Sequence, residues 1–497
     1  MRIKNHDREN ENAPLLEPSF TPSPVQKPRL ATFLLSLCIF FLSGGSAMIQ
    51  VPLTQLMEDN LCDRYLSETG QQGPFTDRAI CKDDGIQSKL AYLNALLGVI
   101  ESVTSLIVAF PYSALADKLG RKPIIYLSTT GSVLYVVWVL AILKFSNLLP
   151  IEYILLGPLL TVVGGGSTVI NACIYSLASD LVPDTDITIS YFVMAFGSLA
   201  GASVGPAISS KLIEQYSPWF PTLIGSLIVP ASMGLLIMLP ETITPRDQSS
   251  ERAASELGKL SPRTLKTFFY QSWADLKTSC QSIRSFSIVL ILITYLRVYP
   301  ENVAYGPLLV QYISKRFDWT FADAGYLLAA RGIGQMLILL VLFPGISKLL
   351  SKYLRPAVKD LILGRASACL VIFGSLLTGA PRIGLVIFGL ILQTSGAGLN
   401  AICRSIAMSY MEAQDKSKMN AMIGIFETFG SMFAGSTLAW LFSQGMKLRG
   451  IWFGLPYYGL AAFSGLCLAG LLFLGPSRHQ DLNDIDEPQS STASDLD

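Results

Sequence analysis

Seven charged side chains lie inside long apolar stretches of this 497-residue sequence: Glu101, Arg297, Glu301, Arg331, Arg365, Arg404 and Glu427. A charge deep in such a stretch costs about 2.5 kcal/mol or more, so it is a functional candidate by default. The carboxylates could exchange protons, and the guanidinium groups could attract an anion. These seven residues are therefore the first candidates for a functional site.

Arg297 and Glu301 are four residues apart, so on a helix they share a face and can form an ion pair. Pro300 and Pro307 flank Gly306 in the same stretch, which predicts a helix that is kinked or broken in its second half. One interpretation is a substrate or coupling site on a bent helix that moves. The other is an ion pair that serves only the structure.

Glu101 and Glu427 have no opposite charge at helical spacing in their own stretches. Away from water, a carboxylate without a cation holds its proton more tightly, so it can load and release that proton near neutral pH. The histidines, His6 and His479, lie in the polar tails, which leaves these two acids and Glu301 as the buried candidates for proton transfer. The alternative for each acid is a hydrogen bond between helices.

Three arginines allow a different role. Arg331, near the middle of its stretch, could attract an organic anion or pair with a buried carboxylate. Arg365 and Arg404 lie within about two turns of a stretch end, so their long side chains can reach the polar surface instead. For Arg365 this second interpretation is preferred.

The elements that must position these residues are membrane-spanning helices. Of all residues, 51% are hydrophobic and only 15% are charged, against about 25% charged in soluble domains. A run of about twenty apolar residues can span a bilayer, where a helix satisfies its own backbone polar groups. Twelve runs are predicted, near 30–51, 89–111, 124–144, 151–178, 188–210, 219–239, 286–312, 322–346, 358–379, 383–409, 420–443 and 452–475. The net charge of +1 gives no indication of a nucleic acid partner.

The basic residues predict the orientation. Lys and Arg outside the runs are about twice as frequent on the side of the two tails, so both termini are predicted to be cytosolic. The first run has no small-residue cleavage site, so it is predicted to be an anchor and not a signal peptide. The plasma membrane is the expected location. A vacuolar membrane is the alternative, from the acidic dileucine pattern at Glu11 to Leu16.

Two of the eight cysteines, Cys62 and Cys81, share one polar segment, the predicted outer loop at about 52–88. That side is oxidising, so a disulfide can form between them and would stabilise the fold by about 3 kcal/mol. Two free thiols are the alternative.

The segment Phe110 to Pro123, FPYSALADKLGRKP, joins two predicted helices on the cytosolic side. It resembles the loop signature of the major facilitator superfamily, with Ser113 in place of the first glycine. The residues that fit are Leu115, Ala116, Asp117, Gly120, Arg121 and Lys122. The resemblance implies an all-α membrane protein with twelve transmembrane helices in two six-helix pseudo-repeats, and no enzymatic activity, cofactor or metal site.

An internal repeat agrees with that fold. Phe-Pro at 110–111 followed by Pro123 recurs as Phe-Pro at 343–344 followed by Pro356, although the second copy lacks the charged signature. The predicted domains are a tail at 1–29, a bundle at 30–240, a cytosolic linker at 241–284, a bundle at 285–475 and a tail at 476–497.

The resemblance also implies a gate. In the family, the loop aspartate and arginine pair across the cytosolic face and hold the outward-open state, which here implies that role for Asp117, Arg121 and Asp180. The sequence departs from the family at Ala172, which replaces an intramembrane arginine whose counterpart in the second half is Arg404. The resemblance therefore does not extend to coupling through an arginine at this position.

Gly201, Gly205 and Pro206 form a second motif, which resembles the antiporter signature of the family. Glycines every four residues also let two helices approach closely, so tight packing is the alternative explanation.

The resemblance implies a monomeric secondary active transporter with alternating access. Export of a small, largely apolar organic compound, such as a drug or secondary metabolite, in exchange for protons is predicted, because the runs carry many aliphatic and aromatic residues. Proton-coupled import of an organic anion is the alternative, favoured by Arg297 and Arg331. A non-transporting receptor or sensor and a passive channel are the alternatives from other classes.

Overall fold

A computed structural model describes residues 28–69, 81–146, 148–182, 187–239, 286–410 and 416–474 of the chain, and every element in these ranges is helical. The N-terminal half, residues 28–239, contains α1 (Pro28–Thr69), α3 (Asp84–Leu119), α4 (Arg121–Lys144), a 3-10 segment (Ile151–Val162), α5 (Gly166–Leu181), α6 (Ile187–Gln215), α7 (Trp219–Ser232) and a second 3-10 segment (Met233–Met238). The C-terminal half, residues 286–474, contains α10 (Phe286–Tyr295), α11 (Val298–Ala304), α12 (Pro307–Phe317), α13 (Phe321–Leu337), a π-helical segment (Ile338–Leu342), α14 (Phe343–Leu350), α15 (Pro356–Thr378), α16 (Ile383–Ser395), α17 (Leu399–Ser409), α18 (Lys416–Leu448), a 3-10 segment (Gly450–Gly454) and α19 (Leu455–Phe473). The predicted linker at 241–284, the C-terminal tail and the dileucine pattern lie outside the described residues.

Ten helices in the described ranges are long and apolar enough to cross a membrane. One further span consists of two helices, Ile288–Ala304 and Pro307–Phe317, that are bent by 48° at their junction. α18 is also long enough, at 33 residues, but is not among these spans. Each of the twelve predicted runs therefore contains helix, and the predicted kink lies in the seventh.

Two predicted loops are largely helical. α1 continues to Thr69, well beyond its predicted end at residue 51, and α3 continues through most of the 110–123 segment to Leu119. Only Gly120, with φ of 99°, separates α3 from α4, and glycine adopts such a φ at little cost. The predictions were wrong here because apolarity marks the part of a helix that lies in lipid, whereas the helix continues until a residue stops it.

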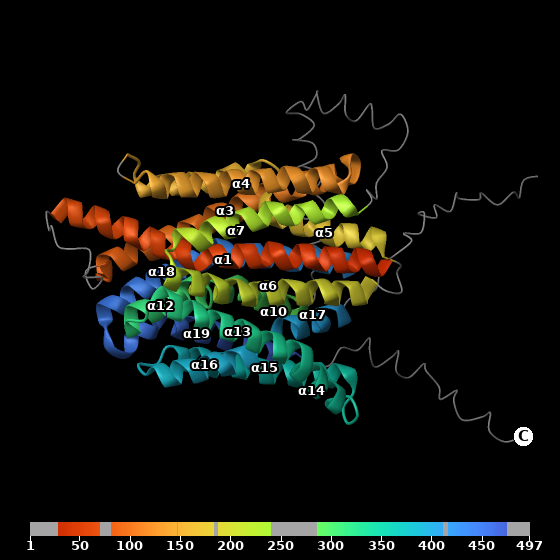
Figure 1. Cartoon of the computed structure of the whole chain (residues 1–497). Coiled ribbons are helices and arrows are strands. Elements are labelled where there is room, and N and C mark those ends of the chain that lie inside the picture. The colour runs from red at the N-terminus through yellow and green to blue at the C-terminus, as the bar shows by residue number, and fades with distance from the viewer. Residues whose placement is uncertain are drawn as a thin grey trace, which may run out of the picture.

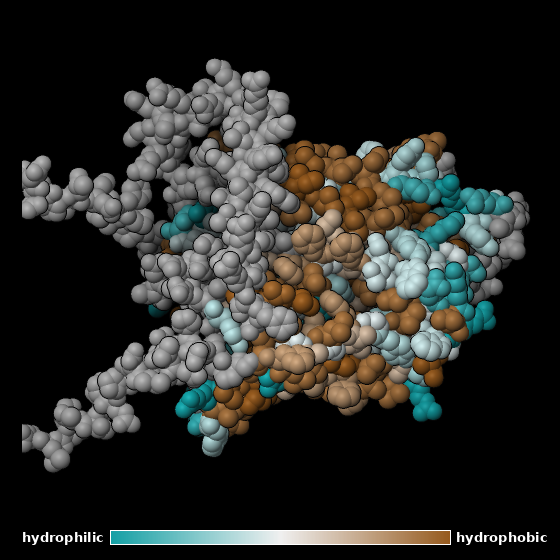
Figure 2. All heavy atoms as spheres, turned by 180° about the vertical axis from the view of Figure 1, so that it is seen from behind, coloured by the Kyte–Doolittle hydropathy of each residue, from teal (hydrophilic) through white to brown (hydrophobic). Residues whose placement is uncertain are grey.

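The helices lie side by side in one elongated bundle (Figure 1). α1 begins and α19 ends at one end of the bundle, here called the tail face. The opposite end is called the disulfide face, because Cys62 in α1 and Cys81 are joined there by a disulfide, one of the two states that the sequence allowed. Seen from the other side, apolar side chains cover the middle of the bundle and hydrophilic ones gather at the disulfide face (Figure 2). An apolar belt of this kind is what a surface in contact with lipid requires.

The glycine motif in α6 packs directly against α1. A Cβ atom at Gly201 would lie 2.2 Å from the carbonyl oxygen of Phe40, and one at Gly205 would lie 2.5 Å from that of Gly44. These glycines therefore let the two helix backbones touch. Close packing is sufficient to explain the motif at both positions.

Candidate functional site

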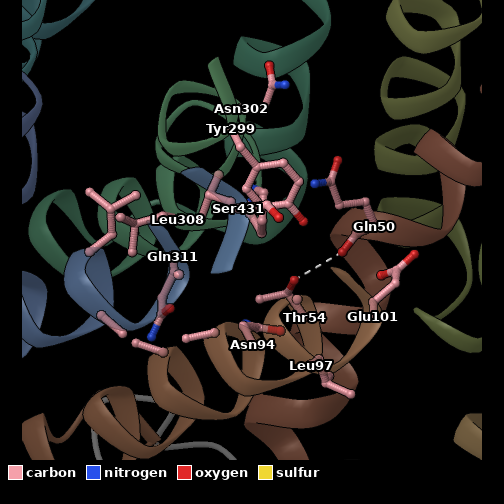
Figure 3. A pocket seen from close by; sticks show the side chains of 18 of the residues that line it. Gln50, Thr54, Asn94, Leu97, Glu101, Tyr299, Asn302, Leu308, Gln311 and Ser431 are labelled. Carbon is pink, nitrogen blue, oxygen red and sulfur yellow. Dashed lines mark hydrogen bonds between the residues drawn. The ribbon is translucent and has the colours of Figure 1, made fainter. Parts of the chain in front are cut away.

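A cavity of about 340 Å³ lies between the two halves. Its walls come from α1, α3 and α4 on one side and from α11, α12 and α18 on the other (Figure 3). The bend in the seventh span places Tyr299 and Asn302 on one side of the break and Gln311 on the other, and all three line the cavity. The polar side chains of the lining are Gln50, Thr54, Asn94, Glu101, Tyr135, Tyr299, Asn302, Gln311 and Ser431.

Glu101 is the only acidic residue in this lining, which contains no lysine, arginine or histidine. It lies near the middle of α3 and is half-buried. Among the described residues its carboxylate has no hydrogen-bond or ion-pair partner. Tyr135 and Tyr299 lie close enough to interact with it electrostatically. Of the three acids that the sequence singled out, Glu101 alone lines the cavity.

Arg297 and Glu301 form the ion pair that their spacing allows, and both side chains are buried. The other carboxylate oxygen of Glu301 accepts a hydrogen bond from the amide of Gln393, and Arg297 donates to Asn400 Oδ1 at 2.8 Å. Both oxygens of Glu301 are therefore bound within the protein. This arrangement favours the structural interpretation of the pair.

Arg331 joins the same network through Gln393. Its Nη2 donates to Oε1 of Gln393 at 3.0 Å, and its guanidinium lies 5.0 Å from the ring centre of Tyr305. Gln393 thus connects Arg331 to Glu301, so the cluster holds two cations and one anion. The sequence did not single out Gln393 and Asn400, because their only signal is an uncharged amide inside an apolar run.

Arg404, Glu427 and Arg365 lie outside the cavity lining. Arg404 in α17 is exposed and lies close enough to Glu427 in α18 to act on it electrostatically, so a neighbouring helix supplies the cation that the helix of Glu427 lacks. Arg365 donates to the carbonyls of Leu471 and Leu474 at 3.2 and 3.0 Å. It therefore caps the C-terminal end of α19, whose last carbonyls have no partner within the helix.

The loop signature lies at the tail face. Arg121 Nη1 is 3.1 Å from Asp180 Oδ2, so the end of α5 is bound to the start of α4. Lys122 donates to the carbonyl of Leu239. Asp117 lies in the last turn of α3, but its side chain is outside the described part of the structure.

Polar contacts join the two halves at the disulfide face. Lys315 Nζ lies 2.7 Å from Asp84 Oδ1, and Lys82 donates to the carbonyl of Ser314 at 2.7 Å. Each half thus supplies a lysine that binds oxygen atoms of the other half.

The buried apolar clusters show the same difference between the two ends of the bundle. One buried cluster spans both halves and includes Ala95, Tyr305 and Leu438. Near the tail face each half has its own cluster, one containing Leu177 and the other Ile402. In Figure 1, α14 also lies well apart from the N-terminal half at that end. The structure is therefore closed at the disulfide face, and its halves part toward the tail face.

Together these features define a polytopic helical membrane protein whose two halves enclose a small cavity. Residues 33–306 match the family model described as Major Facilitator Superfamily, so the chain belongs to that superfamily. The protein is accordingly a membrane transporter and not an enzyme.

Similar proteins include fungal transporters. The MFS efflux pump atnC of Emericella nidulans is 28% identical, over 94% of this chain and 93% of its own. The MFS-type transporter aprT of Aspergillus flavus is 26% identical, over 91% of this chain and 90% of its own. The efflux pump ustT of Aspergillus flavus is 21% identical, over 84% and 82%.

Solved structures share the fold. The human organic anion transporter MFSD10 (TETRAN) aligns with a TM-score of 0.53 at 16% identity, covering 90% of this chain and 99% of its own. A D-xylose-proton symporter aligns with a TM-score of 0.61 at 11% identity, covering 90% and 98%.

Proposed function

We propose that this protein exports a small organic compound from the cytosol in exchange for protons, by alternating access to the cavity between its halves. The observation that carries the proposal is Glu101, the only carboxylate in the cavity lining and one without a partner among the described residues. The names of the similar fungal proteins, two of which are called efflux pumps, support the direction.

Proton and substrate alternate at Glu101 in this mechanism. With the cavity open to the cytosol, the ionised carboxylate accepts a hydrogen bond from the substrate. After the halves rock, a proton from the outer side neutralises Glu101 and weakens that bond, so that the substrate leaves. Return of the protonated cavity to the cytosolic side releases the proton. Glu301 has no part in this cycle, because Arg297 and Gln393 occupy its oxygens.

The tail face is cytosolic in this proposal, which follows the excess of basic residues on that side. Asp117, Arg121 and Asp180 then belong to the cytosolic gate, and the ion pair between Arg121 and Asp180 is a candidate for the contact that changes as the gate opens and closes. The protein acts as a monomer in the plasma membrane, with a vacuolar membrane as the alternative.

The test uses inside-out membrane vesicles with an acidified lumen, incubated with a cell extract. Mass spectrometry is expected to find compounds that accumulate with the wild-type protein but not with Glu101→Gln or after addition of a protonophore. Accumulation that survives both treatments would contradict proton coupling through Glu101. The absence of any accumulated compound would favour a receptor or sensor.

Import of an organic anion is the second candidate. The cluster of Arg297, Arg331 and Glu301 carries one net positive charge, which suits an anion. None of these residues lines the cavity, so export is preferred. Right-side-out vesicles whose uptake rises as the outside is acidified would establish import.

A further inference from the structure

The lining of the cavity is rich in carboxamides. Of its twenty residues, four are asparagine or glutamine: Gln50, Asn94, Asn302 and Gln311. They come from α1, α3, α11 and α12, so both halves contribute (Figure 3). The composition of the whole spans, which predicted an apolar substrate, hides this convergence because the four residues are far apart in the sequence.

Three of these carboxamides are available to a ligand. Among the described residues, the side chains of Gln50, Asn94 and Asn302 make no hydrogen bond. Gln311 differs, because its amide nitrogen donates to the backbone carbonyl and side-chain oxygen of Gln87 at 2.7 and 2.9 Å.

Several buried amides outside the cavity are bound by the protein itself, although Oε1 of the buried Gln55 has no partner among the described residues. Gln393, for example, donates to Glu301 and accepts from Arg331. Buried polar groups are normally paired in this way. Gln50 and Asn94 are only half-buried and Asn302 is exposed, so their amides are open to the cavity and can bind a molecule that comes from outside the chain.

The chemistry of the walls defines that partner. A carboxamide both donates and accepts hydrogen bonds, and so complements an amide or a hydroxyl group. Leu53, Leu97, Leu308 and Leu438 supply apolar surface between the amides. The lining contains no cationic side chain that would neutralise an anion, and the volume is at the small end of the roughly 300–1,000 Å³ typical of ligand pockets.

We infer that the transported substrate is a compact, uncharged, amphipathic molecule that presents amide or hydroxyl groups to Gln50, Asn94 and Asn302, and one hydrogen-bond donor to Glu101. This inference rests on the proposed function. It replaces the largely apolar solute expected from composition with a solute whose polar groups are bound by specific side chains.

The test measures binding of three probes to the purified full-length protein in detergent by equilibrium dialysis. The probes are the cyclic dipeptide of two phenylalanines, its N,N′-dimethyl derivative, which keeps the rings and carbonyls but lacks the N–H donors, and naphthalenesulfonate as an aromatic anion. The cyclic dipeptide is expected to bind at least about fivefold more tightly than either other probe, because a hydrogen bond between uncharged groups contributes about 1 kcal/mol. Equal binding of the dipeptide and its dimethyl derivative, or tighter binding of the sulfonate, would overturn the inference.

Two variants locate the effect. Gln50→Leu and Asn94→Leu should each raise the dissociation constant of the cyclic dipeptide about fivefold, with little change for the dimethyl derivative. Asn171→Leu, which replaces an exposed carboxamide of α5 outside the cavity lining, is the matched control and should change neither. If one carboxamide variant does not fold, the other still decides, and an unchanged dissociation constant in a folded carboxamide variant would overturn the inference.

Transport is measured separately in proteoliposomes with and without a pH gradient. Preference for the cyclic dipeptide without proton-driven movement supports the substrate class and contradicts the proposed exchange. Proton-driven accumulation of naphthalenesulfonate with no preference for the dipeptide contradicts the substrate class and leaves proton coupling intact.

Discussion

Glu101 and Glu301 are both carboxylates in transmembrane helices, but their surroundings give them different roles. Glu301 is held by Arg297 and Gln393, whereas Glu101 faces the cavity without a partner among the described residues. Removing a group from a buried ion pair leaves an uncompensated charge, and removing an unpaired acid does not. Substitution of Glu301 should therefore lower the stability of the protein, whereas substitution of Glu101 should lower transport and leave stability unchanged.

Replacement of Glu301 by glutamine is expected to lower the free energy of unfolding by about 3–5 kcal/mol, because the guanidinium of Arg297 remains buried without its counter-charge. The double variant Arg297→Met with Glu301→Leu should recover most of this loss. Thermal unfolding in detergent checks both. Glu101→Gln is the control and should unfold close to the wild-type temperature. Wild-type stability of Glu301→Gln together with lost transport would instead assign Glu301 to coupling.

The pairing of Arg297 with Glu301 could be predicted because both residues lie on one helix at fixed spacing. Gln393 and Asn400 could not, because they reach Glu301 and Arg297 from α16 and α17, and their contacts depend on how the helices pack. The convergence of the cavity amides could not be predicted for the same reason. A sequence lists polar residues in order but does not say which of them meet.

At the scale of the elements, runs of apolar residues predicted where the helices lie, but not where α1 and α3 end. The kink of the seventh span followed from Gly306 and Pro307, since proline lacks the N–H that would bind the preceding turn. The extension of α1 to Thr69 did not follow, because a polar helix beyond the bilayer has no apolar signal. The same extension carries Cys62 to the position where it meets Cys81.

Gly201→Ala is expected to destabilise the protein by about 1–3 kcal/mol, because the added methyl group would lie against the backbone of α1. Thermal unfolding of the purified protein measures the effect. Gly465→Ala in α19 is the matched control, since nothing lies within 4 Å of its Cβ position, and it should be neutral or stabilising by up to about 1 kcal/mol. A Gly201→Ala protein that is fully stable but has lost proton exchange would favour a direct antiporter role for the motif.

The disulfide between Cys62 and Cys81 leads to a second prediction, about thiol reactivity and stability. Purified, unreduced protein should carry no maleimide at Cys62 or Cys81, and both should react after reduction. Replacing both residues by serine should lower the free energy of unfolding by about 3 kcal/mol, since the bridge closes a loop of about twenty residues. Peptide mass spectrometry gives the first result and thermal unfolding the second. Labelling before reduction would show two free thiols.

At the scale of the whole molecule, the position of the contacts between halves describes one state of the transport cycle. The halves share an apolar cluster and polar contacts at the disulfide face, and have separate clusters near the tail face. For transport, the disulfide face must open in turn. The lysines at that face are therefore expected to set how often the cavity opens there.

Lys315→Glu should favour opening at the disulfide face, because it turns the attraction between Lys315 and Asp84 into repulsion. Asp84 is partly exposed, so the pair contributes no more than about 1 kcal/mol, which corresponds to about a fivefold change in the open population. The measurement is the rate at which a membrane-impermeant maleimide, added from the disulfide face, labels a cysteine introduced at Ser431 in the cavity lining. That rate should rise severalfold in Lys315→Glu.

Exchanging the charges of Lys315 and Asp84 tests whether the effect comes from their attraction or from a general loss of stability. Asp84→Lys combined with Lys315→Glu restores opposite charges across the same contact and should return the labelling rate toward that of the wild type. Arg64→Glu is the control, because Arg64 pairs with Glu68 and Glu152 within the N-terminal half and not across the two halves. A labelling rate that rises equally in Arg64→Glu, or that stays high in the exchanged pair, would mean that the contact between Lys315 and Asp84 does not hold the disulfide face closed.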